Sequence, residues 1–472
     1  MSEISNIEEK LPLSQKVNYA LVNVSLNTLN GIVGTGMTFF YTNILKLNPE
    51  KAGIAWLIFG IWNAINDPLL GTLQDRTRTK KGRRMPYLRY GSFIYAILFI
   101  LCWYPIGDTS NQTVLFYNLL LALCAFDTLF TLLGCIVYPL PAEIALKSRN
   151  RSTLMVWSNI IGGIFGLFTS VLTSYLLLES GSESIDSLHP FFRPSMIIIG
   201  VVMGIMMFVN SYFLKENLYT IDEEPLGFIQ SFVETFKNRA FIIYEIGVFL
   251  VLIAESMLGT GLLYYVSDVL QINGILVTIP YLLLAISQIV FSIIINRLVP
   301  KHGLKKILIF GVIWLALSLL LMFGIGWWYF GALIGLIIAS FGMAAVSLTS
   351  SPLFADIVDY DEMRTGKRRE TSYSGIQAFL TKFCISIGTW LFLFIIGRFG
   401  YDVYQSSQTF MAKFGIMLSI FVIPSIIALL TLLIVRYYPL AGSEWEEKKA
   451  ELEKIHRMKE IEFLKKRKRM TE

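Results

Sequence analysis

Long apolar stretches recur along almost the whole chain, and they constrain its fold more than any other feature. A stretch of about 20 apolar residues is long enough to cross a bilayer as a helix. Several stretches exceed this length, so tilt or extension into the cytoplasm is expected. The twelve segments are residues 17–45, 50–73, 86–106, 112–145, 151–178, 191–214, 240–269, 273–299, 305–325, 327–355, 372–398 and 409–437.

The apolar runs are continuous, which predicts helices rather than strands. In lipid, every backbone polar group must be satisfied internally, so only helices and closed barrels can span a membrane. Barrel strands would show apolar residues at every second position. Charged residues make up 16% of the chain, against roughly 25% in soluble domains. We therefore predict an all-α membrane protein with twelve transmembrane helices.

Lys and Arg gather in loops that follow even-numbered apolar segments. Residues 76–84, after the second segment, contain six of them, and the loops after the fourth and eighth segments are also basic. The loop after the fifth segment instead carries Glu179, Glu183 and Asp186. Cytoplasmic loops are enriched in Lys and Arg. Both termini are therefore predicted to be cytoplasmic, in a multi-pass protein of the cell membrane.

A polar segment of mixed charge divides the apolar segments into six and six. The two halves echo each other, because Arg76 precedes Gly82 by six residues and Arg297 precedes Gly303 by six. Duplicated six-helix units are found in transporters. We predict a cytoplasmic N-terminus (1–16), an N-terminal six-helix bundle (17–214), a central cytoplasmic loop (215–239), a C-terminal six-helix bundle (240–437) and a charged, helical cytoplasmic tail (438–472).

Two charged blocks at matching places in the halves resemble those of a known family. Residues 66–87 contain NDP, DR and GRRMPY, and residues 356–370 contain DIVDYDE followed by TGKRRE. These motifs are similar to those of the glycoside–pentoside–hexuronide:cation symporters, a branch of the major facilitator superfamily that includes melibiose permease. The resemblance covers residues 15–440. Animal lysolipid transporters share both blocks, so the blocks do not fix the substrate.

The charges of these loops could form an inner gate. Carboxylates and arginines at the cytoplasmic helix ends would pair between the halves and separate as the halves rock. The alternative is a role in topology and solubility only, since exposed pairs contribute about 0–1 kcal/mol each. We favour gating, because a gate needs several weak contacts. The predicted gating residues are Asp75, Arg76, Arg83, Glu143, Arg151, Asp356, Asp359 and Arg368.

The resemblance also implies where a cation and a sugar would bind. The family holds both with acidic residues on segments 1, 2 and 4, with an aromatic residue one turn later on segment 4, and with an arginine on segment 5 and a lysine on segment 11. Most of the charged positions are neutral in this chain, although Asp67 and Lys382 remain. The corresponding residues are Asn27, Asn63 and Asp67, then Gly134 and Tyr138, then Asn159 and Lys382.

The loss of carboxylates bears on the coupling ion. A Na⁺ site needs several oxygen ligands, and fewer carboxylates weaken it, although Asn27 and Asn63 still offer carbonyl oxygens. A proton needs only one titratable group, and Asp67 could serve. We therefore expect H⁺ in preference to Na⁺ as the coupling ion.

Three further polar residues lie inside apolar segments, where polar and ionisable side chains usually face a cavity or a partner. Asp127 shares a helix face with Gly134 and could replace the missing acid, or it could lie near the outer headgroups. Glu255 could face the cavity from the opposite half, and Gln377 could join Lys382 on segment 11. Lys382 has possible partners in Asp67 and Glu255. We thus predict cation binding by Asp67, Asn63, Asn27 and Asp127, and substrate binding by Tyr138, Gly134, Asn159, Lys382, Gln377 and Glu255.

We interpret the chain as a secondary active transporter of a sugar or glycoside by alternating access. Alternatives are a lysolipid or other amphiphile transporter of the same fold, an uncoupled sugar facilitator, and a receptor that transports nothing.

The chain has no P-loop, HExxH or dinucleotide-binding motif, so neither an enzyme nor an ATP-driven pump is expected. Its four cysteines lack CxxC spacing, so no metal site is expected. The expected partners are a small-molecule substrate and the bilayer, with no nucleic acid, no cofactor besides the coupling ion, and a monomeric state.

Overall fold

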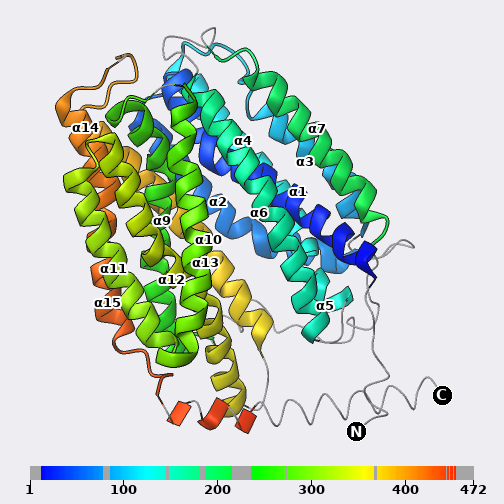
Figure 1. Ribbon diagram of the computed structural model, residues 1–472. Coiled ribbons are helices and arrows are strands. Elements are labelled where there is room, and N and C mark those ends of the chain that lie inside the picture. Colours follow the sequence, from blue (N-terminus) through cyan, green and yellow to red (C-terminus); the bar gives the residue numbers. More distant parts are fainter. Residues whose placement is uncertain are drawn as a thin grey trace. The chain divides into compact units, whose positions relative to one another are not determined.

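The computed structural model describes residues 12–77, 85–144, 148–179, 188–214, 235–272, 274–365, 369–405 and 407–442, and 444, 445, 447–449, 451 and 452 of the tail. Each predicted apolar segment forms one helix or a run of consecutive helices in this part of the chain (Figure 1). Nine of the helices described are long and apolar enough to cross a membrane. The other three predicted spans are the more polar α1 (Leu13–Phe39) and α2 (Pro49–Arg76) and the shorter α3 (Met85–Leu101).

The remaining elements follow the predicted order closely. In the first half they are α4 (Gln112–Val137), α5 (Leu140–Ile144), α6 (Ser148–Leu178) and α7 (Phe192–Ser211). In the second half they are α9 (Arg239–Tyr264), α10 (Thr278–His302), α11 (Leu304–Ile325), α12 (Tyr329–Thr365), α13 (Glu370–Arg398), α14 (Phe410–Met417) and α15 (Ile423–Val435). Short π-helical turns extend α1 (η1, Phe40–Ile44) and α9 (η4, Tyr265–Val269) and join α14 to α15 (η6, Leu418–Val422), and the 3₁₀ turn η5 (Gly274–Val277) precedes α10.

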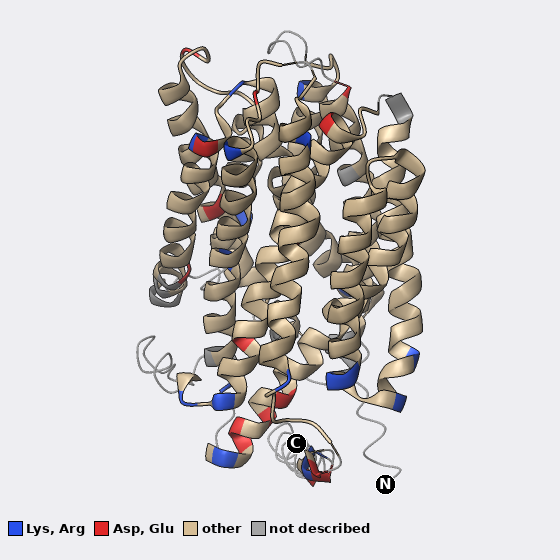
Figure 2. Cartoon of the chain, turned by 90° about the vertical axis from the view of Figure 1, so that its left-hand side faces the viewer, with Lys and Arg blue, Asp and Glu red and all other residues tan. Residues whose placement is uncertain are grey.

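Local polar residues explain where several helices begin. Asn48 accepts hydrogen bonds from the backbone N–H groups of Glu50 and Lys51, and Pro49 occupies the first position of α2. Asn111 and Thr409 cap α4 and α14 in the same way. Charged residues gather toward the helix ends, and most helical turns between them carry none (Figure 2). Capped ends and apolar interiors are what a spanning helix requires.

Glycines allow close helix crossings within the bundle. At Gly342 on α12, an added Cβ would lie 2.7 Å from the backbone nitrogen of Leu315 on α11. At Gly204 on α7, it would lie 2.7 Å from the Cβ of Ala96 on α3. Small residues at such crossings let helix backbones approach each other, which is how helices associate in membranes.

The chain forms two compact units, each built from several segments. The first unit comprises Met1–Pro225, Glu255–Leu282 and Lys382–Ile420, and the second comprises Leu226–Ala254, Leu283–Thr381 and Phe421–Glu472. The predicted division into an N-terminal (17–214) and a C-terminal (240–437) six-helix bundle stays a prediction. The predicted N-terminus, central loop and distal tail lie mostly outside the described residues.

Candidate functional site

An ion pair joins α2 to α13 inside the first unit. Lys382 Nζ lies 2.5 Å from Asp67 Oδ1, and the side chains are 17% and 23% exposed. The same ammonium donates a hydrogen bond to Thr131 Oγ1 on α4 at 2.7 Å. Three helices therefore meet at Lys382. The structure brings together a residue predicted for the cation with one predicted for the substrate, and it adds Thr131, which the sequence analysis missed.

Asp127 lies within electrostatic reach of this pair, on α4. It is buried, and its Oδ2 accepts a hydrogen bond of 2.8 Å from Asn66 Nδ2. Buried polar groups are nearly always paired, yet the Oδ1 atoms of Asn63 and Asn66 are buried with no hydrogen-bond partner among the residues described. Asn63, Asn66 and Asp67 share one face of α2. This face thus presents a carboxylate and two unused carbonyl oxygens.

A second polar network links α1, α4 and α6. Tyr138 Oη donates to Asn27 Oδ1 at 3.0 Å, and Asn27 Nδ2 donates to both the backbone and side-chain oxygens of Asn23 at 2.8 Å. Asn23 in turn donates to Ser158 Oγ at 2.5 Å. The structure thus joins Asn27 to Tyr138 as neighbours. The contact on α6 is made by Ser158 and not by the predicted Asn159, which is exposed.

Gly134 has a steric role in this network. An added Cβ there would lie 3.0 Å from Cε2 of the Tyr138 ring, so the glycine makes room for that ring one turn further along α4. A carboxylate side chain at this position would therefore compete with the Tyr138 ring for the same space.

The two predicted residues of the second half do not join the Lys382 pair. Gln377 belongs to the second unit, where its Nε2 donates to Tyr244 Oη at 3.2 Å. Glu255 is half-buried and has neither a hydrogen bond nor an ion pair with any described residue. Of the two partners suggested for Lys382, the structure shows Asp67, and Thr131 is a further contact of the ammonium.

Most predicted gating side chains are not among those that the structure describes. These are Asp75, Arg76, Arg83, Glu143, Arg151 and Arg368. Asp359 is half-buried on α12. Asp356 is buried, and its Oδ1 lies 2.6 Å from Lys449 Nζ of the tail.

A bidentate ion pair near the same end of α12 was not predicted. Arg369 donates to both carboxylate oxygens of Asp361 at 2.7 and 2.8 Å, and Arg364 lies 3.7 Å from the same carboxylate. Asp361 and Arg369 both belong to the charged blocks that carry the family resemblance, so the motif was visible although the pairing was not. No sequence pattern connects Lys449 to Asp356.

Comparison with known proteins places the chain among transporters. Residues 18–442 match the family model described as MFS/sugar transport protein. An uncharacterized symporter of Bacillus subtilis, YnaJ, is 28% identical over 95% of this chain and 96% of its own length. A glucuronide carrier protein homolog of Escherichia coli is 25% identical over 91% and 93%, and an isoprimeverose transporter of Lactiplantibacillus pentosus is 23% identical over 83% and 81%.

Solved structures share the fold at lower sequence identity. The nucleoside transporter NupG is 15% identical with a TM-score of 0.60, and the match covers 90% of this chain and 99% of that one. The xylose transporter XylE of Escherichia coli is 15% identical with a TM-score of 0.62, covering 92% and 98%.

Proposed function

Because this chain belongs to the MFS/sugar transport protein family of the major facilitator superfamily, we propose that it moves a sugar or glycoside across the cell membrane by cation-coupled alternating access. The observation that carries this proposal is the ion pair of Asp67 with Lys382 inside otherwise apolar helices. Ionisable groups at such depth are costly and mark substrate and ion pathways. The names of the relatives, a glucuronide carrier homolog and an isoprimeverose transporter, support a sugar as substrate.

Several predictions from sequence are confirmed at the level of family and fold. The chain is a multi-pass membrane transporter of the major facilitator fold, not an enzyme. The resemblance to the glycoside–pentoside–hexuronide:cation symporters is also confirmed. Secondary transport of a small molecule is the function of this family. The placement of both termini in the cytoplasm rests on the distribution of Lys and Arg and remains part of the proposal.

The geometry around Lys382 supports H⁺ as the coupling ion. Protonation of Asp67 would remove the charge that holds the ammonium. Lys382 could then donate hydrogen bonds to substrate hydroxyl groups. Substrate and proton would in this way favour the same state, which is the condition for coupling.

Coupling to Na⁺ is a second candidate, favoured by a specific observation. The Oδ1 atoms of Asn63 and Asn66, which have no hydrogen-bond partner in the described part of the chain, lie on the same helix face as the Asp67 carboxylate. Oxygen atoms of this kind bind hard cations. In this alternative, Na⁺ would take the place of the Lys382 ammonium beside Asp67. We favour H⁺, because the ammonium already holds that place.

The remaining predicted substrate residues extend the proposal. Tyr138 presents an aromatic ring that is half exposed, with its hydroxyl fixed by Asn27. Asn159, Gln377 and Glu255 stay predictions.

The proposal is tested by uptake into proteoliposomes. The panel contains labelled glycosides, among them a glucuronide and isoprimeverose, and one lysolipid, each with and without imposed H⁺ and Na⁺ gradients. We expect accumulation of one glycoside above equilibrium in a proton gradient, lost in Asp67→Asn but kept in the exposed control Asp108→Asn. Uptake of the lysolipid alone would overturn the substrate class. Accumulation driven only by Na⁺ would replace H⁺, and equilibration without accumulation would show an uncoupled facilitator.

A further inference from the structure

Two segments, one in each half of the chain, share an unusual backbone. α1 ends in the π-turn Phe40–Ile44, and α9 ends in the π-turn Tyr265–Val269. Two residues after each turn, Lys46 and Gln271 have φ values of 66° and 50°. They are the two non-glycine residues with positive φ in the described part of the chain. Isolated π-turns and left-handed non-glycine residues are uncommon, and both concentrate at functional places.

The hydrogen bonds of the two segments also correspond. Leu45 N donates to Phe40 O at 3.0 Å, and Leu270 N donates to Tyr265 O at 3.0 Å. The next bonds, from Leu47 N to Tyr41 O and from Ile272 N to Val266 O, follow the same pattern at 2.9 and 3.4 Å.

The sequences align without a gap. FYTNILKLN (40–48) corresponds to YVSDVLQIN (265–273), so Thr42 matches Ser267 and Asn43 matches Asp268. A repeated backbone with a related sequence agrees with the predicted duplication of the two halves.

Asn43 and Asp268, which occupy equivalent positions, bind the same hydroxyl group. Asn43 Nδ2 donates to Tyr401 Oη at 2.8 Å, and Tyr401 Oη donates to Asp268 Oδ2 at 2.9 Å. Tyr401 lies in the loop after α13 and is 7% exposed. A hydroxyl has one proton to donate and lone pairs to accept. The Tyr401 hydroxyl therefore accepts from one amide and donates to one carboxylate. With two carboxylates, one of them would receive no hydrogen bond from this hydroxyl.

The flanking residues repeat the arrangement. Lys46 Nζ donates to the backbone oxygen of Val403 at 2.5 Å, and its equivalent Gln271 donates to Ser407 Oγ at 3.1 Å. Both acceptors belong to the loop that carries Tyr401. The two helix ends also touch directly, since Thr42 Oγ1 and Tyr264 Oη are 2.5 Å apart. Every residue of this arrangement belongs to the first unit.

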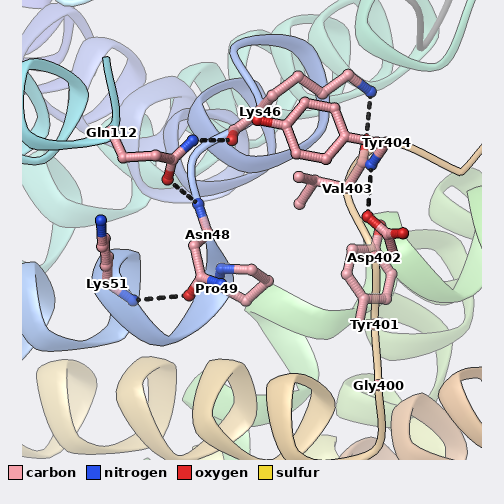
Figure 3. A pocket seen from close by; sticks show the side chains of 10 residues that line it. All are labelled: Lys46, Asn48, Pro49, Lys51, Gln112, Gly400, Tyr401, Asp402, Val403 and Tyr404. Atoms are coloured by element: carbon pink, nitrogen blue, oxygen red, sulfur yellow. Dashed lines mark hydrogen bonds between the residues drawn. The ribbon is translucent and has the colours of Figure 1, made fainter. Parts of the chain in front are cut away.

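A pocket of about 470 Å³ lies beside this loop (Figure 3). The side chains of Lys46, Tyr401 and Tyr404 line it, and Tyr404 is 70% exposed. The loop therefore borders open space at Tyr404, whereas Tyr401 is buried with its ring 5.7 Å from that of Tyr264.

We propose that Asn43, Asp268 and Tyr401, here called the gate cluster, close the end of the transport pathway opposite the predicted cytoplasmic gate, and that the cluster must open in each transport cycle. The inference rests on the proposed function. Alternating access requires the two halves to separate at one end while the other end closes. At this end the Tyr401 hydroxyl bridges equivalent side chains of the two halves, so its loss removes one hydrogen bond from each of them.

Hydrogen–deuterium exchange of the ligand-free protein in nanodiscs tests the gate cluster without a known substrate. Tyr401→Phe removes only the bridging hydroxyl, and Tyr404→Phe removes an exposed hydroxyl from the same loop as the control. We expect amide exchange in residues 40–48 and 265–272 to rise together by about tenfold in Tyr401→Phe, as the loss of two buried hydrogen bonds implies. The control should match wild type. Unchanged exchange, or a rise confined to the loop, would overturn the proposal.

A charge exchange between the repeats gives a second test. Asn43→Asp alone places two carboxylates on one hydroxyl and should raise exchange in both segments. Adding Asp268→Asn restores one amide and one carboxylate, and exchange should return toward wild type. Failure of the double variant to restore protection, when it folds with the thermal stability of wild type, would contradict the bridge.

Transport separates a gate from a structural contact. With a transported sugar, Tyr401→Phe should change the maximal uptake rate severalfold and leave the equilibrium dissociation constant near wild type. An unchanged rate would show that the cluster is structural only. If no sugar is transported by the wild type but the exchange results hold, the proposed function fails while the opening of the cluster stands.

Discussion

The candidate site depends on the ammonium group of Lys382, which contacts both Asp67 and Thr131. In Lys382→Met, the Asp67 carboxylate stays among the helices without its ion-pair partner. We expect the free energy of unfolding to fall by about 2 kcal/mol. This is less than the loss typical of a fully buried ion pair, because both side chains are partly exposed. Thermal unfolding in detergent measures the loss. The double variant with Asp67→Asn should regain most of it, because neither charge is then unpaired. Equal stability of the single variant and wild type would show that water solvates Asp67 well enough to replace the lysine.

Sequence reasoning found some residues of this site and missed others for a definite reason. Asp67 and Lys382 stand out because charge is rare in apolar segments. Thr131 and Asn66 do not, since threonine and asparagine are unremarkable in such segments and acquire meaning only from contacts between helices. Tyr401 was missed for the same reason.

At the scale of elements, the crossing of α11 with α12 depends on Gly342. The variant Gly342→Ala would place its Cβ against the backbone of Leu315, and neither backbone can move without disturbing the crossing. We expect a loss of about 1–3 kcal/mol, typical of overpacking, measured as a lower melting temperature in detergent. Gly324→Ala on α11 is the matched control, because its added Cβ meets no atom of a described residue within 4 Å. A similar loss in both variants would point to a general effect of glycine replacement instead of this crossing.

The tail packs against α12, a contact that no sequence pattern predicted. Trp445 is buried and its ring lies 6.1 Å from that of Tyr360, while Lys449 pairs with the buried Asp356. Lys449→Ala would leave that carboxylate unpaired, and we expect a loss of about 1–3 kcal/mol in unfolding free energy. Lys448→Ala removes an exposed pair with Glu444 and should change nothing measurable. If the two variants behave alike, the tail does not depend on Asp356.

At the scale of the molecule, hydropathy and length were sufficient to predict the helices but not their packing. Twelve apolar segments predicted the helices because lipid leaves no other backbone arrangement for continuous runs. The compact units, in contrast, combine residues 1–225 with residues 255–282 and 382–420, and no periodicity reveals such contacts. The repeat that ends α1 and α9 was present in the sequence. Its significance became clear only from the matching π-turns.

Coupling is a property of the whole molecule, and it has a reciprocal thermodynamic signature. If protonation of Asp67 frees Lys382 for the sugar, sugar binding must take up a proton to the same extent that a proton strengthens sugar binding. The dissociation constant should therefore fall as pH falls, and calorimetry in buffers of different ionisation enthalpy should detect proton uptake. Asp67→Asn should abolish both effects, whereas the exposed Asp108→Asn should keep them. Binding that depends on Na⁺ but not on pH would assign the site beside Asp67 to the sodium ion, with Asn63 and Asn66 as its neutral oxygen ligands.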